Sequence, residues 1–156
     1  MEVHNINPVY DENSKILILG SFPSVKSREE QFFYAHPQNR FWKVVSNILN
    51  EPLPQTIAEK KQMLLRNNIA VWDVIKSCYI VGSSDSSIEN VVVNDIDIIL
   101  KNANITKLFA NGDKSYKLFK KYFPKNMEIT KLPSTSPANA QYGLERLCKE
   151  WEIIRN

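Results

Sequence analysis

The sequence predicts an α/β fold with a single domain and three layers, in which helices flank a central four-stranded, mainly parallel sheet. Short apolar segments alternate four times with amphipathic helical patterns, which is typical of a parallel sheet covered on both faces. The chain has 156 residues, of which 43% are hydrophobic and 24% charged, the composition of one globular domain. Because no linker or internal repeat interrupts the pattern, we treat residues 1–156 as one domain.

Four short apolar segments are expected to form the sheet. The first, Lys15-Ile-Leu-Ile-Leu-Gly20, is a continuous apolar run closed by glycine, as expected for a strand buried on both faces. The other strands are predicted at residues 69–75, 105–110 and 127–132. Asn111-Gly112, directly after the third segment, reads as the turn that ends that strand.

Two helices are predicted between the first and second strands. Residues 39–50 place apolar side chains on one face, and the pattern stops before Pro52, which would break a helix. Thr56 and Glu59 have the spacing of a capping box, in which each side chain accepts a bond from the other residue's backbone amide. This box predicts a second helix that starts at Thr56 and runs to about residue 67.

Three further helices follow the remaining strands. Asn94 is expected to cap a short helix with isoleucines at positions 96, 98 and 99. Asp113 is expected to cap a helix that turns aromatic residues inward and lysines outward, until Pro124 ends it. Apolar residues at the helical period, starting from about Asn139, predict the last helix.

The cysteines and the amino-terminal segment exclude several classes of protein. Cys78 and Cys148 lie 70 positions apart and no His/Cys cluster occurs, so we expect neither a metal site nor an iron–sulfur cluster. The same two cysteines suit a reducing, cytoplasmic compartment. Residues 1–15 lack the apolar core of a secretion signal, and no window approaches the ~20 apolar residues of a membrane span.

Positive charge is concentrated in one part of the chain. The formal net charge is only +3, yet residues 101–131 contain eight lysines against two acidic residues, a local net charge of +6. Such a stretch is usually a solvated helix face, but it also suits a surface that meets phosphates. Lys114 is one candidate contact in it.

The loops that follow the four strands are the first places to search for function. In a parallel α/β sheet, ligands bind outside the carboxyl ends of the strands. That rule selects residues 21–39, 72–85, 111–113 and 133–139, and these segments contain most of the unusual polar residues.

The loop after the first strand, GSFPSVKS at residues 20–27, partly matches a phosphate-binding loop. The glycine that must precede the lysine of such a loop is replaced by Val25. Pro23 also removes a backbone amide hydrogen that a phosphate cradle would use. A tight turn is the plain alternative, and a nucleotide hydrolase is the less favoured functional one.

An aromatic segment, FYAHPQNRFW at residues 33–42, surrounds one histidine and one asparagine. The plain interpretation is core packing, with Asn39 capping the following helix. The functional interpretation is a slot in which a flat heterocycle stacks on a ring while an amide holds a water or reads an edge.

Five segments spread over the chain resemble the motifs of the uracil-DNA glycosylase superfamily, and most of all its hypoxanthine-DNA (deoxyinosine) glycosylase family. In chain order they are GSFPSVKS, YAHPQNRFW, VWDVIKSCYIVGSSDSSI, FANG and LPSTSPAN. The resemblance implies an enzyme that removes a deaminated base from DNA without a metal or cofactor and leaves an abasic site. It also implies a DNA partner and a nucleoid-associated, cytoplasmic protein, which we expect to be a monomer.

The resemblance implies roles for individual residues. Asn39 corresponds to the family's catalytic asparagine, which holds the water that attacks the sugar. Phe41 corresponds to the ring on which the flipped base stacks, and Asp73 stands where relatives keep an asparagine that reads the base edge. The other implied contacts are Gly20, Ser21, Phe22 and Asn111 with the base, and Ser24, Ser134, Ser136 and Pro137 with the DNA backbone. The charge distribution adds Lys114 as a further candidate contact with the DNA backbone.

Two departures from the best-known uracil enzymes bear on the substrate. Their acidic water activator in the first motif is replaced by Phe22, and the histidine that opens their second motif is replaced by Leu132. We therefore expect hypoxanthine to be the first substrate and uracil the second. A non-catalytic nucleic-acid-binding module on the same fold is the rival. His36 is expected to be structural, and Asp85 is expected to cap a helix rather than to touch the base pocket.

Overall fold

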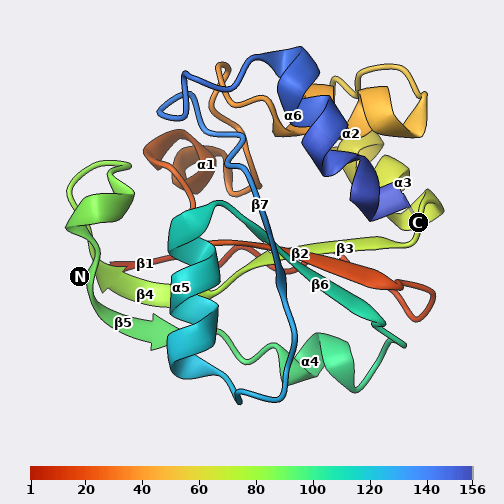
Figure 1. Ribbon diagram of the computed structural model, residues 1–156. Coiled ribbons are helices and arrows are strands. Elements are labelled where there is room, and N and C mark those ends of the chain that lie inside the picture. Colours follow the sequence, from red (N-terminus) through yellow and green to blue (C-terminus); the bar gives the residue numbers. More distant parts are fainter. Residues whose placement is uncertain (156) are drawn as a thin grey trace.

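Four parallel strands form the central sheet of the protein (Figure 1). The structure is a computed structural model and describes residues 1–155. The spatial order of the strands is β3-β2-β6-β7, so β2 and β6 occupy the middle. The sequence prediction of a four-stranded parallel sheet in an α/β fold is confirmed. The strands span Ile16–Gly20 (β2), Ile69–Asp73 (β3), Lys107–Asn111 (β6) and Thr130–Leu132 (β7).

A second, antiparallel sheet was not predicted. Its three strands have the order β1-β4-β5, and they comprise Glu2–Val3 (β1), Ile75–Tyr79 (β4) and Glu89–Val93 (β5). The predicted strand at residues 69–75 is therefore wrong at its end, because the chain leaves the first sheet after Asp73 and enters the second at Ile75. Asn94 secures this bend: its Nδ2 donates to the Asp73 carbonyl oxygen at 2.9 Å and its backbone amide to that of Val74 at 2.8 Å.

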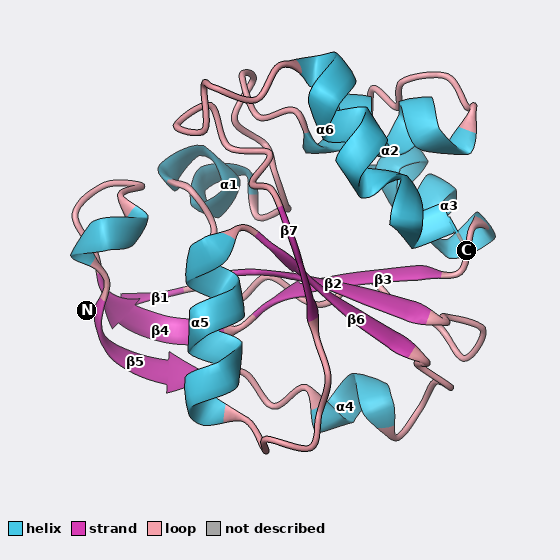
Figure 2. Ribbon diagram, viewed as in Figure 1, coloured by secondary structure: helices cyan, strands magenta, loops and turns pink. Residues whose placement is uncertain are grey.

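Helices lie on both sides of the central sheet (Figure 2). Helix α5 covers β6 and β7, while α2, α3 and α6 gather on the other side, with α2 packed on α6 and α3 on β3. Within residues 1–155, no helix is long and apolar enough to cross a membrane. The α-helices span Val25–Glu30 (α1), Phe41–Leu49 (α2), Ile57–Arg66 (α3), Asp97–Leu100 (α4), Asp113–Tyr122 (α5) and Leu144–Trp151 (α6), with 3₁₀ turns at Asp85–Ser87 (η1) and Glu152–Arg155 (η2).

Several helix starts differ from the prediction. Asn94 does not cap α4, since its side chain serves the bend described above. Asp113 is the first residue of α5 and makes no capping bond; its carboxylate instead accepts from Lys117 Nζ at 2.8 Å, and Gly112 occupies the cap position. The last helix begins at Leu144 rather than near Asn139, because residues 133–143 form a loop over the sheet edge.

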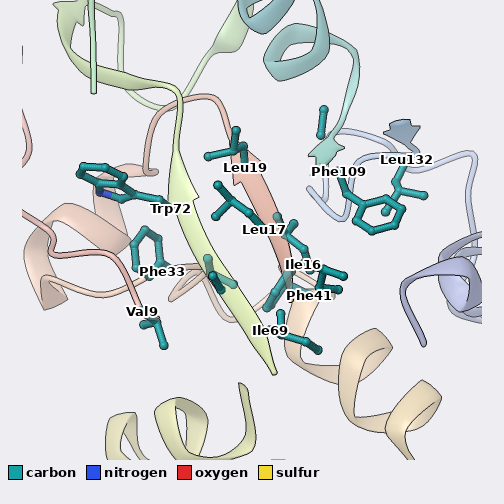
Figure 3. Close-up of a cluster of buried hydrophobic side chains, with 14 of the residues drawn as sticks. Val9, Ile16, Leu17, Leu19, Phe33, Phe41, Ile69, Trp72, Phe109 and Leu132 are labelled. Atoms are coloured by element: carbon teal, nitrogen blue, oxygen red, sulfur yellow. The ribbon is translucent and has the colours of Figure 1, made fainter. Parts of the chain in front are cut away.

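The core is centred on β2, whose five residues are all buried. Leu17 and Leu19 lie among side chains from β3, β6 and the helices (Figure 3). This is the environment predicted from the continuous apolar run at residues 15–20.

Strand register brings the carboxyl ends of all four strands to one edge. Gly20 pairs with Asp73, and Asn111 pairs with Leu132. Because all four strands run in the same direction, the loops that follow them share this edge.

The capping box at the start of α3 gives a test of local stability. The Thr56 hydroxyl accepts from the Glu59 amide at 3.1 Å, and the Glu59 carboxylate accepts from the Thr56 amide at 3.2 Å. Thr56→Ala should lower the free energy of unfolding by ~1 kcal/mol, as measured by urea denaturation, because a helix amide loses its acceptor. Thr56→Ser, which keeps the hydroxyl, is the control, and an alanine variant as stable as the parent would contradict the prediction.

Candidate active site

A pocket of about 270 Å³ lies at the carboxyl edge of the central sheet. All four predicted segments contribute to it, and the second does so through Asp73 and through Ser83 and Asp85 in the loop between β4 and β5. The residues that line it are Gly20, Ser21, Phe22, Pro23, Ser24, Ser27, Phe33, Tyr34, His36, Asn39, Asp73, Ser83, Asp85, Asn111, Ser134, Thr135, Ser136, Pro137 and Ala138.

Asn39 lies at the wall of the pocket, just outside α2. Its Oδ1 accepts a hydrogen bond from the Phe41 backbone amide at 2.9 Å, so it supports the start of the helix although Arg40 is the cap residue. The same oxygen accepts a second hydrogen bond, from Thr135 Oγ1, also at 2.9 Å. The backbone amide of Asn39 donates to the His36 carbonyl oxygen at 2.9 Å, which fixes the turn that carries it.

Asn111 and Thr135 form a reciprocal pair across the pocket edge. Asn111 Oδ1 accepts from the Thr135 amide and Asn111 Nδ2 donates to Thr135 Oγ1, both at 3.0 Å. Thr135 is fully buried, and sequence reasoning passed over it in favour of its neighbours Ser134 and Ser136. The sequence signal that could have identified Thr135 was its position inside the LPSTSPAN segment.

Phe41 does not line the pocket. It is fully buried in the core (Figure 3), and its ring stacks on that of Tyr34 with centroids 4.0 Å apart and planes at 15°. The expectation that Phe41 offers its ring to a ligand is therefore not supported by its position. Tyr34, from the same aromatic segment, lines the pocket instead and Phe41 lies behind it.

The hydroxyl of Tyr34 is buried and makes no hydrogen bond of normal geometry with residues 1–155. Burial raises the pKa of this phenol, and the nearby Asp73 carboxyl raises it further, while the Asn111 side chain opposes part of the change. The phenol is therefore protonated at any ordinary pH and available as a donor.

Asp73 ends β3 at the base of the pocket and is only 3% exposed. A Cβ atom at position 20 would lie 2.5 Å from Asp73 Oδ1 and 3.1 Å from the Tyr34 hydroxyl, so only glycine leaves room there. Asp73 Oδ2 has no hydrogen-bond partner within residues 1–155. Burial, and next the charge of Asp85, raise the pKa of Asp73 to about 7.

His4 lies behind Asp73 but does not neutralise it. Burial lowers the pKa of His4 to about 4, so the ring is uncharged. Its Nε2 lies 2.8 Å from the Ile75 carbonyl oxygen and its Nδ1 accepts from the Ile6 amide, which places the ring proton on Nε2. The Nε2 proton is therefore donated to the Ile75 carbonyl oxygen and not to Asp73, although Nε2 lies 3.8 Å from Asp73 Oδ2.

Asp85 belongs to the pocket, contrary to the prediction that it caps a helix. It lies within η1, where Ser84 holds the cap position, and its Oδ1 accepts from Ser21 Oγ at 2.8 Å. Burial raises the pKa of Asp85, whereas the Ser21 hydrogen bond and the positive charge of Lys114 lower it. Two carboxyl groups, that of the buried Asp73 and that of the more exposed Asp85, thus line the same cavity.

The predicted DNA-contacting serines have mainly local bonds. Ser24 Oγ caps α1 by accepting from the Ser27 amide at 3.2 Å. Ser134 Oγ accepts from the Ser136 amide, and Ser136 Oγ accepts from the Ala138 amide, both at 3.1 Å. These bonds shape the loop at the pocket mouth, which also contains Pro137.

Arg40 ties this loop to the start of α2. Its Nη2 donates to the carbonyl oxygens of Ser136 at 2.9 Å and Asn139 at 3.1 Å, and its Nη1 donates to that of Tyr142. Its backbone amide also donates to the Thr135 carbonyl oxygen at 3.0 Å. Sequence reasoning did not identify Arg40, because these partners lie about 100 positions away.

Two aromatic side chains complete the wall. Phe22 lines the pocket with the Arg28 guanidinium 5.2 Å from its ring centroid. His36 also lines the pocket, and its Nδ1 accepts a local hydrogen bond from the Gln38 amide at 3.1 Å. No group of three or more metal-ligating side chains occurs within residues 1–155.

Comparison with known proteins gives a consistent result over most of the chain. The model of the uracil DNA glycosylase superfamily matches residues 8–156. A hypoxanthine DNA glycosylase from Methanosarcina acetivorans is 36% identical over 148 residues, which cover 94% of this chain and 93% of the relative. One from Methanosarcina barkeri is 36% identical over 117 residues, 74% of each chain.

A solved structure agrees with these sequence relationships. It is a solution NMR structure of a Methanosarcina acetivorans protein provisionally named uracil DNA glycosylase. It superimposes with a TM-score of 0.81 at 33% identity and covers 97% of this chain and 95% of the other. The protein therefore belongs to the uracil DNA glycosylase superfamily and is homologous to hypoxanthine DNA glycosylases.

Proposed function

We propose that this glycosylase removes hypoxanthine first and uracil second from DNA, as the initial step of base excision repair. The observation that carries the proposal is the pocket at the sheet edge, which gathers Asn39, Asp73 and Asn111 in a chain homologous to hypoxanthine DNA glycosylases. In the reaction the bond between the sugar and the base breaks, the oxygen of a water bonds to the sugar carbon, and the base leaves with a proton. No lysine is assigned as a nucleophile, so the enzyme is monofunctional.

Bond breaking leaves positive character on the sugar and negative charge on the base. Buried donors placed near the base stabilise that charge. In our proposal these donors are the backbone amides of Ser21 and Phe22, the Tyr34 hydroxyl and the Asn111 side chain. Asn39 is the catalytic residue. Hypoxanthine leaves more readily than adenine because its ring has an oxo group, and a mispaired base is cheapest to flip.

In this proposal the flipped nucleobase lies between aromatic side chains at the pocket wall and the carboxyl group of Asp73 at the bottom of the pocket. Tyr34 and Phe22 offer rings at the pocket wall, and Phe41 supports Tyr34 from behind. Asp73 meets the edge of the base. In its protonated form this carboxyl has one donor and one acceptor, as the amide of an asparagine would, whereas the carboxylate can only accept. Hypoxanthine has a carbonyl oxygen that needs a donor.

The direct test uses oligonucleotides with one hypoxanthine, uracil or xanthine, followed by alkali cleavage at abasic sites. Hypoxanthine should be excised fastest, chelator should leave the rate unchanged, and borohydride should trap no protein–DNA adduct. Asn39→Ala should lower the single-turnover rate by ~10²-fold with little change in affinity, because its contribution is made in the transition state. Asn13→Ala, in an exposed loop, is the control. Absence of excision by the parent on all three bases would reject the proposal.

The protonation of Asp73 predicts a pH dependence. Excision should fall as pH rises through about 7, where the carboxyl loses its proton, and Asp73→Asn should remove that fall. Because the pKa is raised above its ordinary value of 3.8, ionising this group opposes folding. Asp73→Asn should therefore raise the free energy of unfolding by ~1 kcal/mol or more at pH 8. This gain in the free energy of unfolding should shrink as pH falls from about 7 towards 3.8, where the parent carboxyl is protonated in the folded protein.

The control for Asp73 is Asp113→Asn at the protein surface. The pKa of Asp113 is lowered by its hydrogen bond with Lys117, so neutralising it should give no gain in stability. Melting temperatures measured from pH 4 to 8 separate the two cases. If Asp73→Asn and the parent melt alike at every pH, the Asp73 carboxyl is not protonated in the way proposed.

Lys114 is proposed to contact a DNA phosphate near the pocket mouth, where its charge acts on Asp85. Lys114→Ala should weaken binding to all sequences by a similar factor and reduce the slope of log Kd against log salt by about one. Lys15→Ala is the matched control, since exposed Lys15 precedes β2 at the opposite edge of the sheet. An unchanged slope for Lys114→Ala would assign this lysine to an ordinary solvated surface.

A further inference from the structure

The side-chain oxygen of Asn39 is fully used within the protein. Oδ1 accepts from the Phe41 amide and from Thr135 Oγ1, each at 2.9 Å. An amide oxygen has two lone pairs, so these two bonds saturate it. Nδ2 is in the opposite situation, because it makes no hydrogen bond to any residue between 1 and 155 and Asn39 lines the pocket.

The hydrogen-bond partners of the Asn39 side chain determine which of its two terminal atoms is the oxygen and which is the nitrogen. The Phe41 backbone amide can only donate, so the Asn39 atom that faces it must be the oxygen. The Thr135 hydroxyl accepts from Asn111 Nδ2 and therefore donates its own proton to Asn39. The Thr135 amide, which donates to Asn111 Oδ1, fixes Asn111 in the same way.

These bonds form a directed chain from Asn111 through Thr135 to Asn39. Thr135 is fully buried, and its backbone is held on both sides by Asn111 and Arg40. Its hydroxyl therefore has little freedom to leave the chain. Thr135 itself is too deeply buried to be a good substrate ligand.

We infer that Thr135 positions Asn39 so that Asn39 acts on the substrate as a hydrogen-bond donor, through Nδ2, to the departing base. This inference rests on the proposed function and deepens it. A saturated Oδ1 is not free to accept a hydrogen bond from the attacking water, which is the role that the family resemblance implies for Asn39. The base gains negative charge as its bond to the sugar breaks, and a donor that is already oriented stabilises that charge without reorganisation.

Asn39→Asp separates the donor role from the water-holding role. Aspartate keeps an oxygen for Phe41 and Thr135 and supports a helix start as well as asparagine, so the fold should be retained. It replaces Nδ2 with a negatively charged oxygen. The donor role predicts a single-turnover rate on hypoxanthine DNA at least as low as that of Asn39→Ala, ~10²-fold below the parent. A rate equal to or above the parent's would overturn the inference, because a carboxylate is the better acceptor for a water proton.

Thr135 variants test the positioning role in the same assay. Thr135→Val keeps the shape but removes the hydroxyl, and it should lower the single-turnover rate by about tenfold with lesion-DNA affinity unchanged. Thr135→Ser keeps the hydroxyl and should restore the rate to within about threefold of the parent. A valine variant at the parent rate, or a serine variant as slow as valine, would overturn the role of the hydroxyl.

Stability and parent activity keep the outcomes distinct. Thermal melting is measured for each variant, and if Thr135→Val does not fold, Asn39→Asp and Thr135→Ser still decide the question. The parent is assayed first on hypoxanthine, uracil and xanthine. An inactive parent rejects the proposed function and this inference with it, whereas an active parent with an active Asn39→Asp rejects the inference alone.

Discussion

The contact between Gly20 and Asp73 is the constraint on which the rest of the site depends. These residues pair across β2 and β3, and the carboxyl group of one lies where a side chain of the other would begin. The register of the two strands places these residues side by side, and the close approach is possible because glycine has no Cβ atom. Everything else in the pocket is arranged around this point, from the Tyr34 hydroxyl above it to His4 behind it.

The pocket combines groups that carry no formal charge with two carboxyl groups whose pKa is raised, that of Asp73 to about 7. Burial raises the pKa of both Asp73 and Asp85, and neither has a cation in direct contact within residues 1–155. The wall opposite consists of amides and hydroxyls in fixed directions. Such an environment suits a reaction in which charge appears only as a bond breaks, because fixed dipoles respond without rearrangement.

Local sequence patterns predicted the central sheet well because its strands are short apolar runs, and the capping box at Thr56 correctly marked the start of α3. The same patterns could not show where residues 69–75 divide between two sheets. That division depends on Asn94, which bonds to Asp73 and Val74, 21 and 20 positions earlier in the chain. The short helix expected after Asn94 is present as α4, but the capping role assigned to Asn94 was wrong for the same reason, because its side chain makes a distant bond instead.

The location of the candidate site at the strand ends also followed from the sequence, but the roles of single residues followed less well. Phe41 and Tyr34 belong to the same aromatic segment, and only the backbone path decides which ring reaches the pocket. Tyr34 has a positive φ of 51°, an uncommon conformation for a residue other than glycine. Asp85 and Thr135 were misjudged because their partners, Ser21 and Asn39, are 64 and 96 positions away.

The aromatic side chains packed behind Tyr34 include Phe41 and, from α6 near the end of the chain, Trp151. Phe41 meets the Trp151 ring edge-on, with centroids 5.9 Å apart, and the Trp151 indole nitrogen donates to the Pro133 carbonyl oxygen at 2.8 Å. One residue of α6 thus braces both the aromatic wall and the first residue of the loop at the pocket mouth. Fraying of this terminal helix would therefore loosen the aromatic wall and the loop at the pocket mouth together, without any change in the central sheet.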